Sequence, residues 1–169
     1  MLHESLNVEQ ALALLAETPP RIAAVTARLT PTQLLTIPGP DEWSANETLA
    51  HLRSCADVWG KCIRTLLDQD GPRLRAVSPR AWIRKTTYRE QPFRDSFRAF
   101  AAQRADLLTV LTSLAPDAWS RTATVTGPGK PHTVTVLSYA ERLAVHERRH
   151  LEQFARIAVA IRAAGSCLT

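Results

Sequence analysis

Four long segments of the chain repeat their apolar residues at the spacing of an α-helix, and this pattern most limits what the chain can fold into. The segments span about residues 8–29, 44–70, 92–114 and 136–164. Apolar side chains that recur every three or four residues lie on one face of a helix. The pattern therefore predicts an all-α chain with four long helices.

The second segment carries the clearest helix start. Ser44 followed by Glu47 matches the capping box, in which the Ser side chain accepts from the third backbone amide and the Glu reaches back. The run ends at 70–72, which read Asp-Gly-Pro. In the first segment, Pro19 and Pro20 should kink or break the helix, because proline removes a backbone donor and clashes with the preceding turn.

Two stretches between the helical segments predict connections. Residues 30–41 contain three prolines and a glycine, which indicates an irregular link. Between Arg121 and Val136, alternating threonines flank a Gly-Pro-Gly turn, and this pattern is typical of either a short hairpin or an extended loop. His132 lies in this stretch and is predicted to be an exposed loop residue rather than a metal ligand.

Length and composition indicate one globular domain over residues 1–169. Hydrophobic residues make up 45% of the chain, which is ordinary for a folded protein. The first ten residues lack the basic and apolar regions of a signal peptide, and no apolar run reaches the length of a membrane span. The default expectation is therefore a cytoplasmic protein that does not enter a membrane.

Positive charge is concentrated between residues 71 and 90. The chain carries a net charge of +5, and this stretch holds one acid, Glu90, against six basic residues: Arg73, Arg75, Arg80, Arg84, Lys85 and Arg89. The favoured interpretation is a solvated loop whose arginines pair with acids elsewhere. A collar that attracts an anionic substrate is a second interpretation. Nucleic-acid binding, with Trp82 and Tyr88 stacking on bases, is a third and less favoured one.

The cysteines predict neither a disulfide framework nor a zinc knuckle. Cys55, Cys62 and Cys167 are odd in number and have no CxxC spacing. Cys55 and Cys62 are one heptad apart on an apolar face, which favours small buried core residues. Cys55 also follows His51 by four residues, so its sulfur could reach the rim of a site built around that histidine.

Three histidines stand where a metal site would need them. His146 and His150 are one turn apart on the apolar face of the last segment, and His51 lies near the start of the second. Histidines on an apolar face need partners, and the common alternative is a core imidazole with one hydrogen bond. Three neutral imidazoles with a vacant position are typical of catalytic metal sites. From the residues alone, the two interpretations are about equally weighted.

Two stretches of the sequence resemble a known family. The segment DEWSANETLAHLRSCADVW, in which Trp43-Ser44 opens a helix and His51 follows, resembles the second helix of the DinB/YfiT-like superfamily. The segment TVLSYAERLAVHERRHLEQFARI, with His146, His150 and Gln153, resembles the last helix of that family, whose signature is HxxxH followed by Gln. Chain length, the basic loop and the threonine-rich lead into the last helix also fit, so the resemblance covers most of the chain.

The resemblance implies a four-helix bundle with an up-down-down-up arrangement. It also implies a divalent metal, zinc or nickel, held by His51, His146 and His150, with the remaining positions open to water or substrate. Family members with assigned activity join bacillithiol or a related low-molecular-weight thiol to an electrophile, or are thiol-dependent isomerases. The implied function is a metal-dependent transferase that holds the thiol as a thiolate. From charge, Arg73, Arg84 and Lys85 are candidates for binding carboxylates of the thiol.

Two other functions stay open at this point. The first is a metal-dependent hydrolase, in which Glu147 of the sequence HExxH would be the base to test, although this order is interpreted as coincidental because two arginines follow and no third-ligand motif does. The second is a non-catalytic stress-response binding protein. Asp57, Glu47 and Gln153 are candidates to orient the imidazoles. The expected partner is a small-molecule substrate rather than nucleic acid, and a homodimer is left open.

Overall fold

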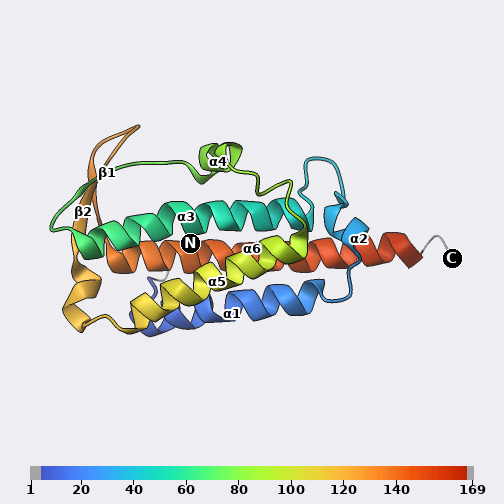
Figure 1. The fold of residues 1–169 in the computed structure, drawn as a ribbon, viewed down its shortest axis with the longest axis horizontal. Helices are drawn as coiled ribbons and strands as arrows, with labels where there is room; N and C mark the ends of the chain where they lie inside the picture. The colour runs from blue at the N-terminus through green and yellow to red at the C-terminus, as the bar shows by residue number, and fades with distance from the viewer. Residues whose placement is uncertain (1–4, 167–169) are drawn as a thin grey trace.

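Four long helices lie side by side and form most of the structure (Figure 1). This computed structural model describes residues 5–166. The long helices are α1 (Val8–Thr26), α3 (Ala45–Asp68), α5 (Phe93–Thr112) and α6 (Val136–Ser166). Their bounds lie within a few residues of the four segments with helical periodicity, so the prediction of four long helices is confirmed.

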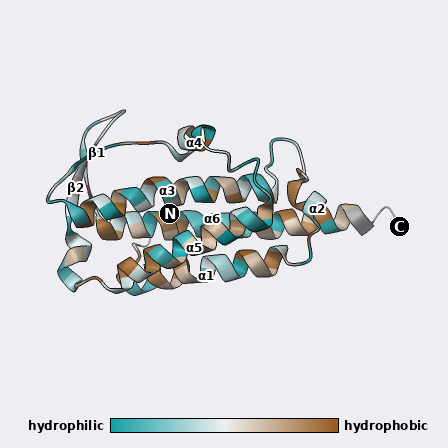
Figure 2. Ribbon diagram, viewed as in Figure 1, coloured by the Kyte–Doolittle hydropathy of each residue, from teal (hydrophilic) through white to brown (hydrophobic). Residues whose placement is uncertain are grey.

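Each long helix packs against two of the other three. Both α5 and α6 contact α1 and α3. Figure 1 shows that α1 and α6 run toward the end of the bundle that carries the short helix α2 (Pro31–Leu35), while α3 and α5 run the opposite way. Apolar residues recur along every long helix (Figure 2), and they meet in the middle of the bundle.

The connection between α3 and α5 returns along the outside of α3 (Figure 1). It contains the strand β1 (Arg73–Arg75), the short helix α4 (Pro79–Trp82) and the 3₁₀ turn η1 (Ile83–Lys85). We call residues 76–92 the crossing segment. The basic stretch was predicted to be a solvated loop. In the structure it contains a strand, a short helix and a 3₁₀ turn.

Side chains of α3 hold the crossing segment by hydrogen bonds. Ser54 Oγ donates to the carbonyl of Pro79 at 2.6 Å, and Asn46 Nδ2 donates to the carbonyl of Arg89 at 3.0 Å. The Asp57 carboxylate accepts from Trp82 Nε1 at 3.0 Å and from the Tyr88 hydroxyl at 2.7 Å. These four bonds place the segment against α3 at several points along its length.

A small sheet covers the end of the bundle that lies opposite α2 (Figure 1). The strands β2 (Thr122–Thr126) and β3 (His132–Thr135) pair antiparallel, with Val125 opposite His132. The hairpin alternative is therefore the right one, and His132 is exposed as predicted. β1 pairs parallel with β2, and a second 3₁₀ turn, η2 (Pro116–Ser120), precedes the hairpin. This third strand was not predicted, because its pairing joins residues about fifty positions apart.

Two predictions about helix ends have different outcomes. The capping box of α3 is confirmed: Ser44 Oγ accepts from the Glu47 amide at 3.1 Å, and the Ser44 amide donates to Glu47 Oε2 at 3.0 Å. Of the kink or break expected at Pro19 and Pro20, the break is wrong, since α1 continues through both. Pro20 has no backbone N–H, so the carbonyl of the exposed Ala16 lacks its helical donor. Solvent can bond that carbonyl instead.

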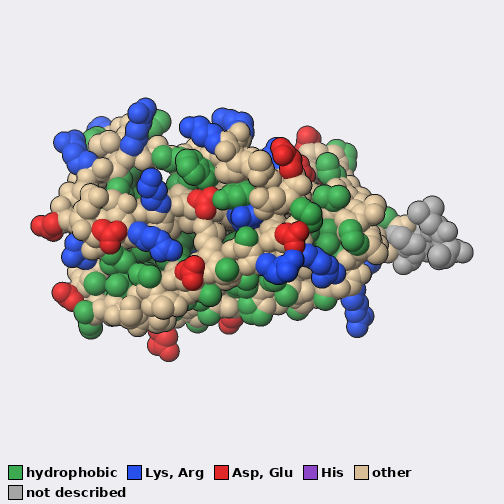
Figure 3. Space-filling view, in the orientation of Figure 1, with side chains coloured by type: hydrophobic (Ala, Val, Ile, Leu, Met, Phe, Trp, Pro, Cys, Tyr) green, Lys and Arg blue, Asp and Glu red, His purple; other side chains and the backbone are tan. Residues whose placement is uncertain are grey.

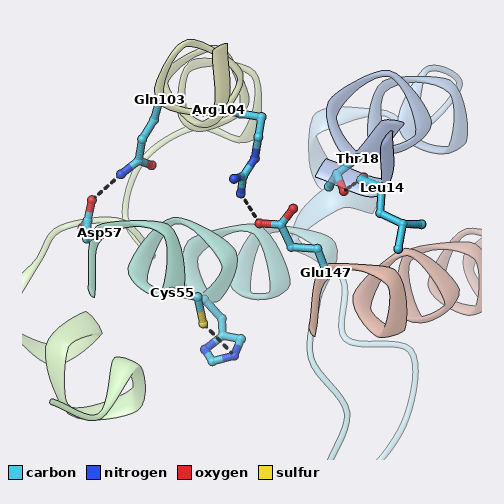
Figure 4. Close-up of polar contacts among 8 residues, drawn as sticks. Leu14, Thr18, Cys55, Asp57, Gln103, Arg104 and Glu147 are labelled. Carbon is cyan, nitrogen blue, oxygen red and sulfur yellow. Dashed lines mark hydrogen bonds and ion pairs between the residues drawn. The ribbon is translucent and has the colours of Figure 1, made fainter. Parts of the chain in front are cut away.

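A buried ion pair crosses the bundle between α5 and α6. Arg104 Nη2 contacts Glu147 Oε1, and their side chains are 1% and 0% exposed (Figure 4). Within residues 5–166, Arg104 Nε, Arg104 Nη1 and Glu147 Oε2 have no hydrogen-bond partner. Removing one charge would leave the other buried without compensation, which costs far more than the pair contributes.

In the described part of the chain, every helix is too short or too polar to cross a lipid bilayer.

The buried pair makes a prediction about stability. We expect Glu147→Gln to lower the free energy of unfolding by about 3–5 kcal/mol, because the Arg104 guanidinium stays buried and charged. The double variant Arg104→Met with Glu147→Leu should lose less than the single variant. Urea unfolding of the metal-free protein measures both, with Glu17→Gln in the exposed pair with Arg21 as the control, expected to change stability by less than about 1 kcal/mol. A loss in the double variant as large as that in Glu147→Gln would contradict the coupling.

Candidate metal centre

The three histidines predicted from the sequence meet between α3 and α6. His51 lies in the second turn of α3, and His146 and His150 lie on successive turns of α6. His146 Nε2 is 3.3 Å from His51 Nε2 and 3.3 Å from His150 Nε2. Two imidazole nitrogens that bind one zinc ion in tetrahedral geometry lie about 3.3 Å apart, given their metal distances. Each of these two spacings fits a pair of nitrogens that share one ion.

Gln153 sets the proton position on His150. Its Oε1 lies 2.7 Å from His150 Nδ1, and an amide oxygen is an acceptor only. Nδ1 therefore carries the proton, and the lone pair of Nε2 faces the cluster. A proton on His146 Nε2 could bond only one of its two neighbours, whereas a cation accepts lone pairs from all three rings. The donor set therefore fits a metal better than a hydrogen-bonded histidine pair.

The electrostatic surroundings keep the three imidazoles neutral. Burial, followed by the neighbouring His150, lowers the pKa of His51 to about 4, and the charges of Arg80 and Arg89 act on this pKa in the same direction. Burial and the other two imidazoles lower the pKa of His146 to about 3. Burial lowers the pKa of His150 as well, against the hydrogen bond to Gln153. Neutral imidazole is the form that a metal binds.

Two tryptophans pack on the histidine rings. The Trp43 ring lies edge-on to His51 with centroids 5.2 Å apart, and parallel to His150 at 6.5 Å. The Trp59 ring lies edge-on to His146 at 5.1 Å. Trp43 immediately precedes the helix cap, and Trp59 lies two turns beyond His51 on α3. These ring contacts limit the rotation of the imidazoles, and both tryptophans line the same cavity as the histidines.

Cys55 lies against the same cluster. Its sulfur is 3.5 Å from His51 Nε2, and one ligand atom each from His51, Cys55 and His146 fall within 4.8 Å of one another. The sulfur thus reaches the site, as its spacing from His51 predicts. Burial, and then the charge of Glu147, raises the pKa of the thiol. His51 and His146 therefore have two neighbours that could complete a ligand set, His150 and Cys55.

The cluster forms part of the wall of an open cavity of about 770 Å³. Its walls come from α3, α6, the loop before α3 and the crossing segment. The charged residues among them are Asp41, Glu42, Arg80 and Arg156. No histidine is visible on the face drawn in Figure 3, where Lys and Arg side chains gather along the edge formed by the crossing segment and the sheet.

Glu147 points away from this cavity. As the residue after His146 it turns onto another face of α6, where its carboxylate meets Arg104 on α5 (Figure 4). In the same view the Cys55 sulfur points away from α5, toward an imidazole. Glu147 is absent from the cavity wall. Glu147, the glutamate of the HExxH order, therefore contacts Arg104 in the core and does not lie where a catalytic base would be needed.

The other polar candidates divide in a similar way. Of the three residues considered for orienting the imidazoles, only Gln153 contacts one. Asp57 bonds the crossing segment and also accepts from Gln103 Nε2 at 2.7 Å (Figure 4), and Glu47 caps α3.

Of the basic residues considered for cofactor binding, only Arg84 lies beside the histidines. It lines a smaller cavity that also contains Trp43 and His51. Arg73 belongs to β1 at the sheet end, and Lys85 is exposed in η1 outside both cavities. Arg80 and Arg156 line the large cavity, and sequence reasoning did not single out either as a site residue. Their chain positions carry no motif, so only the fold reveals them. Cys167 lies outside the described residues.

Comparison with known proteins gives the family. The family model of the DinB superfamily matches residues 14–154. The structure is similar to YfiT from Bacillus subtilis, described as a probable metal-dependent hydrolase with an unusual four-helix bundle topology, with a TM-score of 0.77 and 17% identity over 98% of this chain and 93% of that one. It is also similar to a mycothiol-dependent maleylpyruvate isomerase, with a TM-score of 0.65 and 13% identity over 86% of this chain and 60% of that one. None of the curated protein sequences matches. The chain, whose family model covers both histidine-bearing helices, belongs to the DinB superfamily.

Proposed function

We propose that this protein is a divalent-metal-dependent enzyme that joins a low-molecular-weight thiol to an electrophilic small molecule. The observation that carries the proposal is the convergence of three neutral imidazole nitrogens on the wall of an open cavity. Structural zinc sites are closed by four protein ligands, whereas catalytic ones keep a position for water or substrate. The open side of this cluster is the side that a substrate would reach.

Different residues would bind the ion, orient its ligands and pack around them. His51, His146 and His150 supply the nitrogens, and imidazole ligands suit zinc and nickel alike. When bound, the ion supplies Lewis acidity and lowers the pKa of a coordinated thiol or water. Gln153 keeps the His150 lone pair directed at the centre. Trp43 and Trp59 pack on the rings and help to hold them in place.

The position of Glu147 favours thiol transfer over hydrolysis. A thiol becomes the competent nucleophile on losing one proton, which a cationic centre promotes without a protein base. Its sulfur then forms the bond to carbon, the leaving group keeps the electron pair, and the thiol proton passes to solvent. A water nucleophile benefits from a carboxylate base, and Glu147, the candidate for that role, is committed to Arg104.

Hydrolysis is the second candidate, and a specific observation supports it. Asp41 and Glu42 line the cavity and could serve as the base that Glu147 does not supply. The two similar structures divide in the same way, since one is described as a probable metal-dependent hydrolase and the other as thiol-dependent. Both descriptions support a metal-dependent enzyme and differ in the nucleophile.

Metal content tests the site itself. We expect purified protein to carry about one divalent ion per chain and His51→Ala, His146→Ala and His150→Ala each to lose it, because two imidazoles hold an ion poorly. Gln153→Ala should weaken metal binding by about 10–100-fold, because His150 Nδ1 loses the hydrogen bond that orients the ring. Elemental analysis after dialysis measures the content, with the exposed His132→Ala as the control. Equal metal content in all variants would rule out this ligand set.

A second comparison decides between His150 and Cys55 as the third ligand. His150 has its lone pair directed at the cluster by Gln153, so His150→Ala should lose the ion while Cys55→Ser retains it. Cys62→Ser, one heptad further along α3, is the matched cysteine control. Retention in His150→Ala together with loss in Cys55→Ser would assign the ligand role to the sulfur.

Assays with and without an added thiol test whether the nucleophile is a thiol or water. We expect metal-loaded protein to consume an electrophile such as a haloaromatic compound only when a low-molecular-weight thiol is added, and to lose this activity in His146→Ala. Chromatography of the thioether product measures it. Hydrolysis of esters, amides or phosphoesters without thiol, weakened by Asp41→Asn or Glu42→Gln, would favour the second candidate instead.

A further inference from the structure

A second cavity of about 230 Å³ adjoins the histidine cluster. It shares Trp43, His51 and Arg80 with the wall of the large cavity. Its other walls are Ile83, Arg84 and Arg89, all from the crossing segment. We call this space the arginine chamber. Because His51 belongs to both cavities, a small molecule in the chamber can also reach the metal centre.

All of the charged residues on the chamber wall are positive. Three of its six wall residues are arginines and none is an acid. Across residues 5–166, no carboxylate lies within 4.0 Å of Arg80, Arg84 or Arg89, although the sequence favoured such pairing. Like charges around one space repel one another, and an anion in that space relieves the repulsion.

The backbone that carries the arginines is held against α3, while the three arginines are exposed. The carbonyl of Pro79, next to Arg80, accepts from Ser54, and the carbonyl of Arg89 accepts from Asn46. Between them, Ile83 is buried against the bundle. The Arg80 guanidinium carbon lies 5.8 Å from the centre of the Trp43 ring. The segment that carries the positive charge is thus anchored to α3 on both sides of the chamber.

We propose that the arginine chamber binds the anionic group, carboxylate or phosphate, of a small molecule whose reacting atom lies at the histidine cluster. Guanidinium groups bind both anions through paired N–H donors. The placement of the reacting atom rests on the proposed function, while anion binding by the chamber does not. The substrate class that follows is a small organic anion.

The size and position of the chamber argue against nucleic acid as its ligand. A volume of about 230 Å³ suits one anionic group with its nearest neighbours and is too small for a polymer backbone. Arg73 and Arg75, which would extend a basic track, lie in β1 beside a different cavity near Lys61 and Gln69. Trp82, considered earlier for base stacking, donates to Asp57.

Calorimetric titration of the metal-loaded full chain with inorganic phosphate, and separately with malonate, at constant ionic strength in chloride tests the proposal. We expect Arg84→Gln with Arg89→Gln to weaken the tighter anion by about tenfold or more, as loss of charged hydrogen bonds predicts. Arg73→Gln with Arg75→Gln removes the same charge outside the chamber and should change the Kd by less than about twofold. Arg84→Lys with Arg89→Lys keeps the charge, loses the paired donors, and should fall between them.

Several outcomes would overturn the proposal. These are absence of saturable binding to the unmodified protein, equal weakening in the two glutamine pairs, and stronger binding to DNA oligomers than to either small anion with loss in both pairs. Anion binding that is lost when the metal is removed, and that does not change in the Arg84 and Arg89 variants, would place the anion on the metal ion. This result would also contradict anion binding in the chamber. Arginine-dependent binding by protein that never holds metal would support the chamber while the proposed function fails.

Discussion

The packing of α3 against α6 is the contact on which the site depends. His51 belongs to one helix, and His146 and His150 to the other, so their nitrogens meet only when the two apolar faces are in register. The capping box at Ser44 starts α3 at a defined residue and so sets where His51 falls along it. Leu49 and Leu52 beside His51, and Leu143 and Phe154 around the other pair, are buried in the core. Their burial offsets the cost of placing three imidazoles away from water.

A second layer of organisation comes from the polar face of α3. The crossing segment has little apolar surface of its own, with Ile83 its one buried hydrophobic residue in the described structure. Hydrogen bonds from Asn46, Ser54 and Asp57 hold it along the helix. Such bonds contribute about 1 kcal/mol each, less than the burial of a large side chain. The segment that carries Arg80, Arg84 and Arg89 is therefore held on α3 mainly by polar contacts, whereas the histidines are held by the apolar core.

Local signals predicted the helices well, and they singled out three histidines that the structure brings together. Helical periodicity and the Ser44–Glu47 box depend on residues a few positions apart, and both are confirmed. The fourth-residue spacing of His146 and His150, and of His51 and Cys55, places each pair on one helix face, and the structure brings all four together. The predictions that failed concerned features that depend on tertiary packing. Pro19 and Pro20 were expected to interrupt α1, yet packing of the helix on α5 and α6 outweighs two missing backbone bonds. The strand β1 was missed because its partner lies in a distant hairpin.

By itself, the sequence determined which segments are helical, where α3 begins, and which histidines could share an ion, because each depends on periodicity or on neighbours within one turn. The tertiary structure alone decided how charged residues far apart in the chain are used. Glu147 follows a ligand candidate in sequence, yet the turn of α6 directs it to Arg104 on another helix. Arg73 and Arg84 look alike in one basic run, yet one joins a sheet and the other a chamber beside His51. Their contacts depend on which helices pack together, and no local pattern encodes that.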